Sequence, residues 1–502
     1  MTRLQSLPRG RAPGLLASAL AGAACVPGFA PLHIFPLPIL ALAALAWAVE
    51  RAPDTRAAGR LGFAFGMGLF VAGVGWLYVA LNRFGGMPPW LAIPVMAVFC
   101  AYLSLFPAAA CALSRRAVPG WRIWALAGAW TILEWVRGWL FTGFPWLAVG
   151  YSQVPHSPLA GLAPVVGVFG VGLAAGACAA GLAALGAVST RRAGAAVVAA
   201  LLSCGFAARW VEWTEATGRT LGVTLVQSNV AQDDKFREDR LGGLLADLTQ
   251  AVESARTALV VLPETALPMF LQHVPTETLE RLSAGASARG GDVVVGVFEN
   301  DPPGSERYYN AVLSLGVSPP QSYRKDHLVP FGEFIPLEGV LGPLIRDWLH
   351  IPLSSQSRGG SRQKPLQVAG ERVAMNICYE DVFGEEIIRQ LPEAGLLANV
   401  SNDAWYGHSW AAEQHLQIAQ TRALETGRWM IRATNTGVTA AIDHLGRTQA
   451  QLPQFEAGTL VVEAQVRRGA TPYVRAGNGP AVLAASALLV LALWRRLPAP
   501  AA

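Results

Sequence analysis

Val373-Ala-Met-Asn-Ile-Cys-Tyr-Glu380 is the stretch that decides the fold of the polar part of this chain. Its leading residues are mostly apolar, which is typical of a buried β-strand. A thiol (Cys378) and a carboxyl group follow where the strand should end. Polar residues that follow apolar strands gather along one edge of a sheet, where α/β proteins place their sites. The stretch therefore predicts an α/β domain with a site at Cys378.

Two other stretches carry side chains suited to the same site. The run Ala-Leu-Val-Val-Leu at 258–262 is followed by a proline and Glu264, and Lys325 lies in Tyr-Arg-Lys-Asp-His-Leu-Val-Pro-Phe-Gly-Glu. Of the 39 basic residues only Lys235, Lys325 and Lys364 are lysines. Lysine is a compact point donor, whereas the guanidinium of arginine is wide and planar. We interpret Lys325 as a site residue and expect Lys235 and Lys364 to be solvated.

These three side chains form a coherent set for acyl chemistry. A cysteine attacks a carbonyl carbon only as its thiolate. A carboxylate such as Glu264 can accept the thiol proton and later activate a second nucleophile. An ammonium such as Lys325, together with a backbone N–H near Cys378, can stabilise the tetrahedral oxyanion.

Other interpretations of the same residues stay open at this point. A lone cysteine at a strand end is more often a core residue, and Glu264 alone would fit a helix cap. The histidines at 327, 408 and 415 offer a Cys–His pair instead, although no carboxylate pattern singles one out. No Cys/His spacing indicates a metal site, no cofactor motif is present, and no basic run with interleaved aromatics indicates nucleic-acid binding.

The polar part alternates short β-branched runs with longer helical stretches, which predicts a layered α/β domain. The predicted strands are Leu221–Gln227, Ala258–Leu262, Asp292–Phe298, Asn310–Leu315, Arg372–Ile377, Leu396–Val400, Met430–Ala433 and Val438–Ile442. The predicted helices are 238–256, 275–289, 383–391 and 410–427.

The remainder of the chain is too apolar for an ordinary soluble protein. Hydrophobic residues make up 52% of the sequence and charged residues only 15%, a balance that suggests membrane spans. Eight apolar segments are candidates, at 12–30, 34–49, 61–81, 89–113, 121–141, 158–188, 194–210 and 479–494. We therefore predict a membrane domain over 1–213 with seven transmembrane helices, a polar domain over 219–470 and an eighth transmembrane helix over 479–496.

The positions of the arginines predict the orientation. Thirteen lie at the N-terminus, in alternate connections and at the C-terminus, whereas the opposite short loops hold only Arg83 and Arg137. The positive-inside rule puts the first set and both termini in the cytoplasm, and the polar domain on the outer face. That space is oxidising, where cysteines usually pair. Because the other five cysteines lie in the apolar segments, Cys378 has no partner in its domain and is predicted to be a free thiol.

The ordered Glu264, Lys325 and Cys378 motifs resemble the nitrilase superfamily, whose Glu–Lys–Cys triad acts on carbon–nitrogen bonds. The flanking apolar segments make the chain similar to the membrane-embedded branch of that superfamily. Matching stretches are Arg-Gly-Trp-Leu-Phe-Thr-Gly-Phe-Pro-Trp at 137–146, His-Leu-Val-Pro-Phe-Gly-Glu at 327–333, Ser-Asn-Asp-Ala-Trp-Tyr-Gly at 401–407, Gln-Thr-Arg-Ala-Leu-Glu at 420–425 and Ala-Thr-Asn-Thr-Gly-Val-Thr at 433–439.

The resemblance implies an α-β-β-α sandwich joined to an eight-helix membrane domain. It also implies roles: Glu264 is the general base, Lys325 the oxyanion stabiliser and Cys378 the nucleophile. The remaining implied residues are Glu333 as the second acid, Tyr379 and Glu380 beside the nucleophile, and Trp405, Asn229 and Asn310 as substrate-binding residues. The sequence departs from the family at Phe236, where the family commonly has tryptophan.

The activity that the resemblance implies is acyl transfer in the inner membrane of a bacterium, with the polar domain in the periplasm. Cys378 would take an acyl chain from a phospholipid as a thioester. The α-amine of a lipoprotein's N-terminal diacylglyceryl-cysteine would then accept the chain.

Two other functions remain open from the sequence alone. One is a membrane-anchored amidase or nitrilase that hydrolyses a small carbon–nitrogen substrate, and the other is a transporter or receptor with an outer sensing domain. Ionisable residues inside the spans are scarce, which weakens transport; Glu134 and Arg137 are the main exceptions and fit either an i,i+3 pair or a substrate path. The apolar loop Phe334–Leu353 fits either a lipid-interface segment or a loop packed on its own domain.

Overall fold

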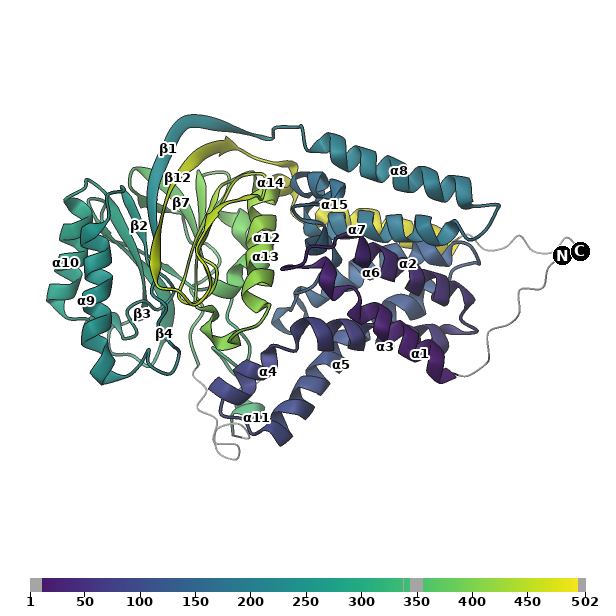
Figure 1. Cartoon of the computed structure of the whole chain (residues 1–502), viewed down its shortest axis with the longest axis horizontal. Coiled ribbons are helices and arrows are strands. Elements are labelled where there is room, and N and C mark those ends of the chain that lie inside the picture. The colour runs from purple at the N-terminus through teal and green to yellow at the C-terminus, as the bar shows by residue number, and fades with distance from the viewer. Residues whose placement is uncertain (1–10, 337, 344–354, 495–502) are drawn as a thin grey trace, which may run out of the picture.

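The computed structural model describes residues 11–336, 338–343 and 355–494. A bundle of long helices forms one end of the molecule and two stacked sheets with flanking helices form the other (Figure 1). Most of the predicted loop Phe334–Leu353 lies outside the described residues, so the structure does not choose between its two interpretations.

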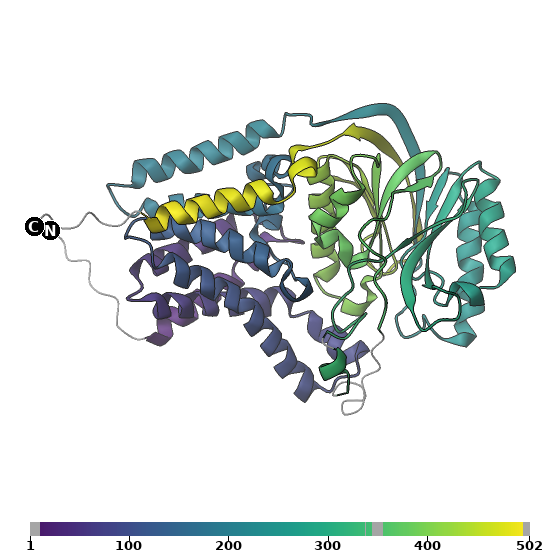
Figure 2. The same ribbon diagram turned by 180° about the vertical axis from the view of Figure 1, so that it is seen from behind.

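All eight predicted apolar segments are helical. The bundle consists of α1 (Arg11–Ala23), α2 (Pro36–Arg51), α3 (Thr55–Val74), α5 (Pro89–Ser114), α6 (Arg122–Arg137), α7 (Ala163–Ala184), α8 (Arg191–Ala208) and α15 (Gly479–Trp494). Within the described residues, four helices are long and apolar enough to cross a membrane: Thr55–Val74, Pro89–Ser114, Pro158–Ala184 and Arg191–Ala208. The other apolar helices are shorter, and Figure 2 shows one of them, α15, lying along the bundle after the chain leaves the sheets.

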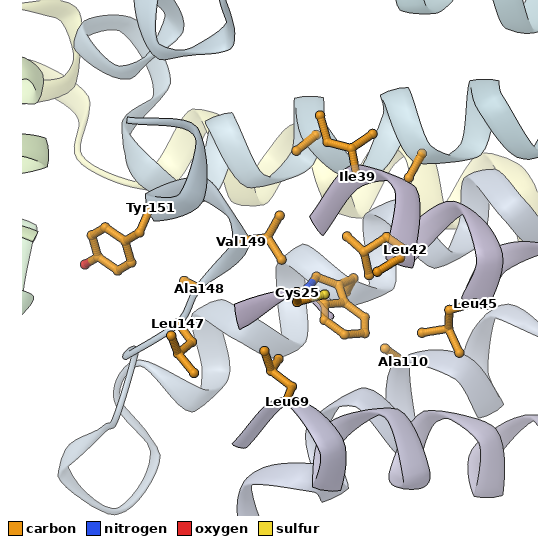
Figure 3. Packing of buried hydrophobic residues seen from close by; sticks show 14 of the residues in the cluster. Cys25, Ile39, Leu42, Leu45, Leu69, Ala110, Leu147, Ala148, Val149 and Tyr151 are labelled. Carbon is orange, nitrogen blue, oxygen red and sulfur yellow. The ribbon is translucent and has the colours of Figure 1, made fainter. Parts of the chain in front are cut away.

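Small residues let the helices of the bundle approach closely. A Cβ on Gly68 of α3 would lie 1.8 Å from the carbonyl oxygen of Ala19 in α1, and one on Gly22 would lie 1.9 Å from that of Phe65. Cys25 lies buried among Leu42, Leu69 and other apolar side chains (Figure 3). It behaves as the small hydrophobe that the sequence predicts, and none of the six cysteines is paired.

The polar part is an α-β-β-α sandwich. One sheet has the strand order β12-β1-β2-β3-β4-β5 and the other β11-β10-β9-β8-β7-β6. Helices α9 (Glu238–Ser254) and α10 (Thr276–Ser287) cover the first sheet, while α12 (Gly384–Ile387) and α13 (Ala411–Thr426) cover the second and face the bundle (Figure 1). The strands of the first sheet are β1 (Thr214–Gln227), β2 (Leu259–Val261), β3 (Asp292–Asn300), β4 (Tyr308–Gly316), β5 (Gln321–Arg324) and β12 (Gly458–Gly469). Those of the second are β6 (Leu366–Val368), β7 (Glu371–Ile377), β8 (Leu396–Ser401), β9 (Met430–Thr434), β10 (Ala440–Ile442) and β11 (Thr448–Gln451).

Side-chain alternation along β2 shows why these runs form internal strands. Leu259 and Val261 join the core between the two sheets, whereas Val260 joins the core beneath α9 and α10. Successive residues of a strand point to opposite faces, so an unbroken apolar run buries both sides. Met375 and Ile377 of β7 meet the same central core from the other sheet. The ends of β2 and β7 are thereby brought to the space between the sheets.

Helix α13 joins the sandwich to the bundle. Every residue of α13 except the half-buried Glu413 is buried, because its apolar side packs on the second sheet and its polar side meets loops of the bundle. Gln414 Oε1 accepts from the Trp146 indole at 2.7 Å, and Gln417 Oε1 accepts from the Ala30 amide at 2.9 Å. Glu425 accepts from the amide of Val168, near the start of α7. A buried polar group must be hydrogen-bonded to avoid a large desolvation cost, so these contacts fix one arrangement of the two parts.

Candidate active site

Cys378 follows β7 directly and is held in an unusual backbone conformation. Its φ is +54°, a left-handed value that is uncommon for a non-glycine residue and often marks a functional site. The carbonyl oxygen of Cys378 accepts from Asn399 Nδ2 at 3.2 Å, and the nearby Ser401 hydroxyl lowers the pKa of the thiol in part. Two residues at the end of the neighbouring strand β8 thus hold the cysteine at the strand end, as the sequence predicts.

Glu264 follows β2 on the opposing sheet. The next residue, Thr265, has a φ of +49°, and the turn crosses over Gly296 of β3. A Cβ on Gly296 would lie 2.4 Å from the Thr265 nitrogen, so only glycine admits the turn. Asn310 Nδ2 donates to Glu264 Oε1 at 2.7 Å, which fixes the carboxylate toward the space between the sheets.

Lys325 follows β5 and is 1% exposed. Its Nζ lies 2.8 Å from Glu333 Oε1 and 3.5 Å from Glu264 Oε1. Burial opposes the charge of this ammonium, but the two carboxylates outweigh it and raise the pKa of Lys325 well above its ordinary value. Lys325 is therefore a fixed cation beside the carboxylate of Glu264.

The protonation state of Cys378 determines which role Glu264 must take. Burial, and then the charge of Glu264, raise the pKa of the Cys378 thiol far above its ordinary value, although Lys325 lowers it in part. The resting residue is therefore a thiol, which is a poor nucleophile. Glu264 is the carboxylate whose charge acts most strongly on the thiol, so it is suited to accept the thiol proton as a carbonyl compound approaches.

Glu380, two residues after the nucleophile, connects the strands that carry Cys378 and Lys325. One carboxylate oxygen accepts from the amides of Asp326 and His327 at 2.6 and 3.1 Å, and the other accepts from the Ile377 amide at 2.7 Å. Burial raises the pKa of Glu380 to about 7, against these backbone hydrogen bonds. Glu380 thus links the segments that follow β5 and β7 through hydrogen bonds to their backbone amides.

Tyr379 connects the nucleophile to the helical bundle. Its hydroxyl donates to the Gly143 carbonyl oxygen at 3.0 Å. The loop that carries Gly143 is held by two ionisable residues near the end of α6: Glu134 accepts from the Val149 amide at 3.0 Å, and Arg137 donates to the Trp146 carbonyl at 2.8 Å. Of the two roles left open by the sequence, the structure supports a structural one, because both side chains bind this loop.

Lys235 is where the sequence-based expectation is wrong. It was expected to be solvated, yet it is only 4% exposed, and its Nζ donates to the Glu264 carbonyl oxygen at 3.1 Å. The polar stretch Ala231–Arg237 gives no hint of burial. The scarcity of lysine is the one signal that would have singled it out.

The three candidate histidines, all within the described residues, do not form a Cys–His pair with the thiol. His415 contacts the Cys378 carbonyl oxygen at 3.3 Å, while its ring nitrogens lie 2.9 Å from Asp381 and Asp403. His327 pairs with Glu386 and His408 packs on Phe455. Among the described residues no cluster of His, Cys, Asp and Glu is arranged to hold a metal ion.

His415 should make stability depend on pH. Burial and Arg432 oppose its protonation, but Asp381 and Asp403 raise its pKa to about 9. The folded pKa exceeds the ordinary value near 6.5, so the stabilisation is complete below that pH and is lost as the pH rises through about 9. We expect the thermal unfolding temperature to fall over this range, with a contribution on the order of 3 kcal/mol. His415→Gln should flatten that part of the curve, whereas the exposed His408→Gln should not. Parallel curves for wild type and His415→Gln would contradict this role.

The predicted substrate-binding residues lie in three different surroundings. Asn310 holds Glu264, as described above. Asn229 donates to the Phe455 carbonyl at 2.8 Å, and Trp405 is 40% exposed with its ring against Phe84 of the bundle. Phe236, which stands where the family has tryptophan, is 56% exposed. Their contact with substrate stays a prediction.

A cavity of about 600 Å³ lies where the bundle meets the sandwich. The bundle side is aromatic, with Trp135, Trp139 and Phe169, whereas the sandwich side carries polar groups such as Arg358 and Arg389. The cavity is therefore amphipathic. Phe383, in its wall, packs edge-on against Tyr379 with ring centroids 5.1 Å apart, which places the cavity next to the nucleophile segment.

Comparison with known proteins covers both parts of the chain. The model of the apolipoprotein N-acyltransferase N-terminal domain matches residues 21–181, and that of carbon-nitrogen hydrolase matches residues 206–473. The apolipoprotein N-acyltransferase of Nitrosomonas europaea is 49% identical over 493 residues, 95% of this chain and 96% of that protein. The protein of the same name from Chromobacterium violaceum is 45% identical over 491 residues, 96% and 94% of the two chains.

Among solved structures, the amidase of Nesterenkonia AN1 from the nitrilase superfamily is similar over 51% of this chain and 93% of that chain, with 18% identity and a TM-score of 0.36. The relatives, in contrast, match at high identity along nearly the whole of both chains. The Glu264–Lys325–Cys378 cluster lies within residues 206–473, which the carbon-nitrogen hydrolase model matches. The chain therefore belongs to the apolipoprotein N-acyltransferase family.

Proposed function

We propose that this protein transfers an acyl chain from a phospholipid to the α-amine of the N-terminal diacylglyceryl-cysteine of lipoproteins. The observation that carries the proposal is the meeting of Glu264, Lys325 and Cys378 from three strand ends, in a chain related over 95% of its length to an apolipoprotein N-acyltransferase. The reaction has two steps and one covalent intermediate.

In the first step, Cys378 loses its proton to Glu264 and its sulfur attacks the ester carbonyl of the phospholipid. The tetrahedral oxyanion is stabilised by the Lys325 ammonium, which Glu333 holds at 2.8 Å. The intermediate collapses to a thioester as the C–O bond breaks, and Glu264 returns its proton to the departing lysophospholipid.

In the second step, the α-amine attacks the thioester carbonyl. Glu264 accepts a proton from the amine, the amide bond forms, and the C–S bond breaks as Glu264 passes that proton to the departing sulfur, which regenerates the Cys378 thiol. A thioester reacts with amines more readily than the starting ester does. Buried apolar walls limit its hydrolysis because they exclude water.

We place the protein in the inner membrane of a bacterium, with eight transmembrane helices. The membrane domain covers 1–213, the catalytic domain covers 219–470 in the periplasm, and the eighth span covers 479–496, with both termini in the cytoplasm. The arginine distribution supports this orientation. Two lipid substrates that share one leaflet would reach the site at the junction beside α13, where the amphipathic cavity supports binding of molecules with a polar head and apolar chains.

A small-molecule amidase is the less favoured alternative, since hydrolysis of a water-soluble substrate would not require the helical bundle. An assay with a phospholipid radiolabelled in its acyl chain and a diacylglyceryl peptide distinguishes the two functions. We expect label on the peptide when its α-amine is free, and none when that amine is acetylated. Release of the label as free fatty acid at one rate with either peptide would overturn the transfer reaction.

A further inference from the structure

Lys235 is a second buried lysine at the site, and the two steps above do not use it. It lies in the connection between β1 and α9, where its own amide donates to the Ala231 carbonyl at 3.1 Å. Its side-chain Nζ donates to the main-chain carbonyl of Glu264, and Glu264 itself is only 6% exposed. Burying an ammonium is costly unless it is compensated, so a surface role does not explain this placement.

Among the four charged side chains Glu264, Glu333, Lys325 and Lys235, the charges balance only when Lys235 is included. Glu264 and Glu333 carry two negative charges, and Lys325, which contacts both, carries one positive charge. Lys235 supplies the second. Moving the thiol proton to Glu264 transfers the negative charge from carboxylate to sulfur and leaves the sum unchanged. A neutral site can therefore hold either the carboxylate or the thiolate without an uncompensated buried charge.

On the basis of the proposed function, we infer that Lys235 is a positioning residue that holds the turn of Glu264 and supplies the second positive charge needed for the thiolate of Cys378. The turn it holds includes the strained Thr265, whose φ of +49° requires support. Lys325 and Lys235 thus have separate tasks. Lys325 contacts the carboxylates and faces the oxyanion, whereas Lys235 acts through the main chain of Glu264 and through its charge.

This role has a pH signature of its own. Burial lowers the pKa of Lys235 to about 8, against the opposing charges of Glu264 and Cys378. Those are the titratable groups that face it, from the turns after β2 and β7, with Lys325 and Glu333 next to Glu264. The ammonium is present below pH 8 and is lost above it. Acylation of Cys378 should therefore slow as the pH rises through about 8, opposite to the trend for a thiol that merely needs to ionise.

The test is single-turnover acylation of the full-length enzyme by phospholipid in micelles, followed by intact mass from pH 6 to 9.5. Wild type should slow about tenfold between pH 7 and 9. Lys235→Met should be slower by roughly 10- to 100-fold at pH 7 and should lose the alkaline decline. Lys235→Arg keeps a charge and should move the decline to higher pH. Lys364→Met, at an exposed lysine, should match wild type.

Three results would overturn the role. Lys235→Met could be acylated at the wild-type rate. It could instead be acylated more slowly by the same factor at every pH, with the rate still declining near pH 8. Lys235→Arg could keep the decline of the acylation rate at pH 8. Thermal unfolding of each variant separates a folding defect from these outcomes. Failure of the proposed function gives a different result. A wild-type enzyme that never gains an acyl chain would overturn both the proposed function and the role of Lys235. An acylated wild type with an unaffected Lys235→Met variant would overturn only the role of Lys235.

Discussion

Replacing Cys378 by alanine should abolish acylation of the enzyme by phospholipid and all transfer to the acceptor peptide. The sulfur is the atom that carries the acyl group, and the other cysteine thiols lie in the helical bundle away from Glu264 and Lys325. Loss of a catalytic nucleophile costs on the order of 10⁶ in turnover in a well-studied hydrolase. Intact mass and lysophospholipid release measure the two consequences independently.

Cys204→Ala is the matched control, because Cys204 is an exposed cysteine of α8. It should be acylated as fast as wild type. Cys378→Ser keeps a nucleophilic atom of higher pKa in the same place, and should release lysophospholipid far more slowly than wild type. A long-chain adduct on the Cys378→Ala protein would contradict the assignment of the nucleophile.

Glu264→Gln should slow acylation by roughly 10³-fold at pH 7, within the range for a general base. The reason is the environment of Cys378, whose pKa burial raises far above its ordinary value, so that little thiolate exists without a base. Glutamine has nearly the same shape, and its carbonyl can still accept from Asn310. The defect should therefore reflect proton transfer rather than misfolding.

Two observations check this interpretation of Glu264. Raising the pH below about 8, where Lys235 keeps its charge, should partly restore the rate of Glu264→Gln, because hydroxide replaces the missing base. Glu253→Gln removes an exposed carboxylate of α9 that pairs with Arg281 and should behave as wild type. If Glu264→Gln were acylated within threefold of the wild-type rate, Glu264 would not be the base.

Much of the fold follows from local sequence patterns. The eight predicted strands and four predicted helices of the sandwich all overlap observed elements, because apolar runs and helical periodicity record burial directly. The strands that the sequence analysis missed are β5, β6, β11 and β12. The first three have at most four residues each. Along β12, exposed residues alternate with half-buried ones over the first half of the strand, and its pairing with β1 is a long-range contact that no local pattern records.

The residues of the site that the sequence revealed carry local signals. Glu264 and Cys378 each follow a predicted apolar strand, whereas Lys325 follows β5, which the sequence analysis missed, and stands out by its motif. Lys235, His415 and the Gly143 loop were not predicted, since their roles depend on contacts between segments far apart in the sequence. Gly143 reaches Tyr379 only because the bundle docks on the sandwich, an arrangement that hydropathy does not encode. Buried polar contacts between distant segments can be identified only from the structure.

The central claim is that Cys378 carries a long acyl chain between two lipids. Its most direct test is intact mass of the wild-type enzyme after exposure to native lipids, before and after addition of a diacylglyceryl peptide with a free α-amine. We predict a mass increase of one long-chain acyl group on Cys378, lost on addition of the peptide as the same mass appears on its amine. An enzyme with no adduct, or with one that persists when the peptide is added, would contradict the account.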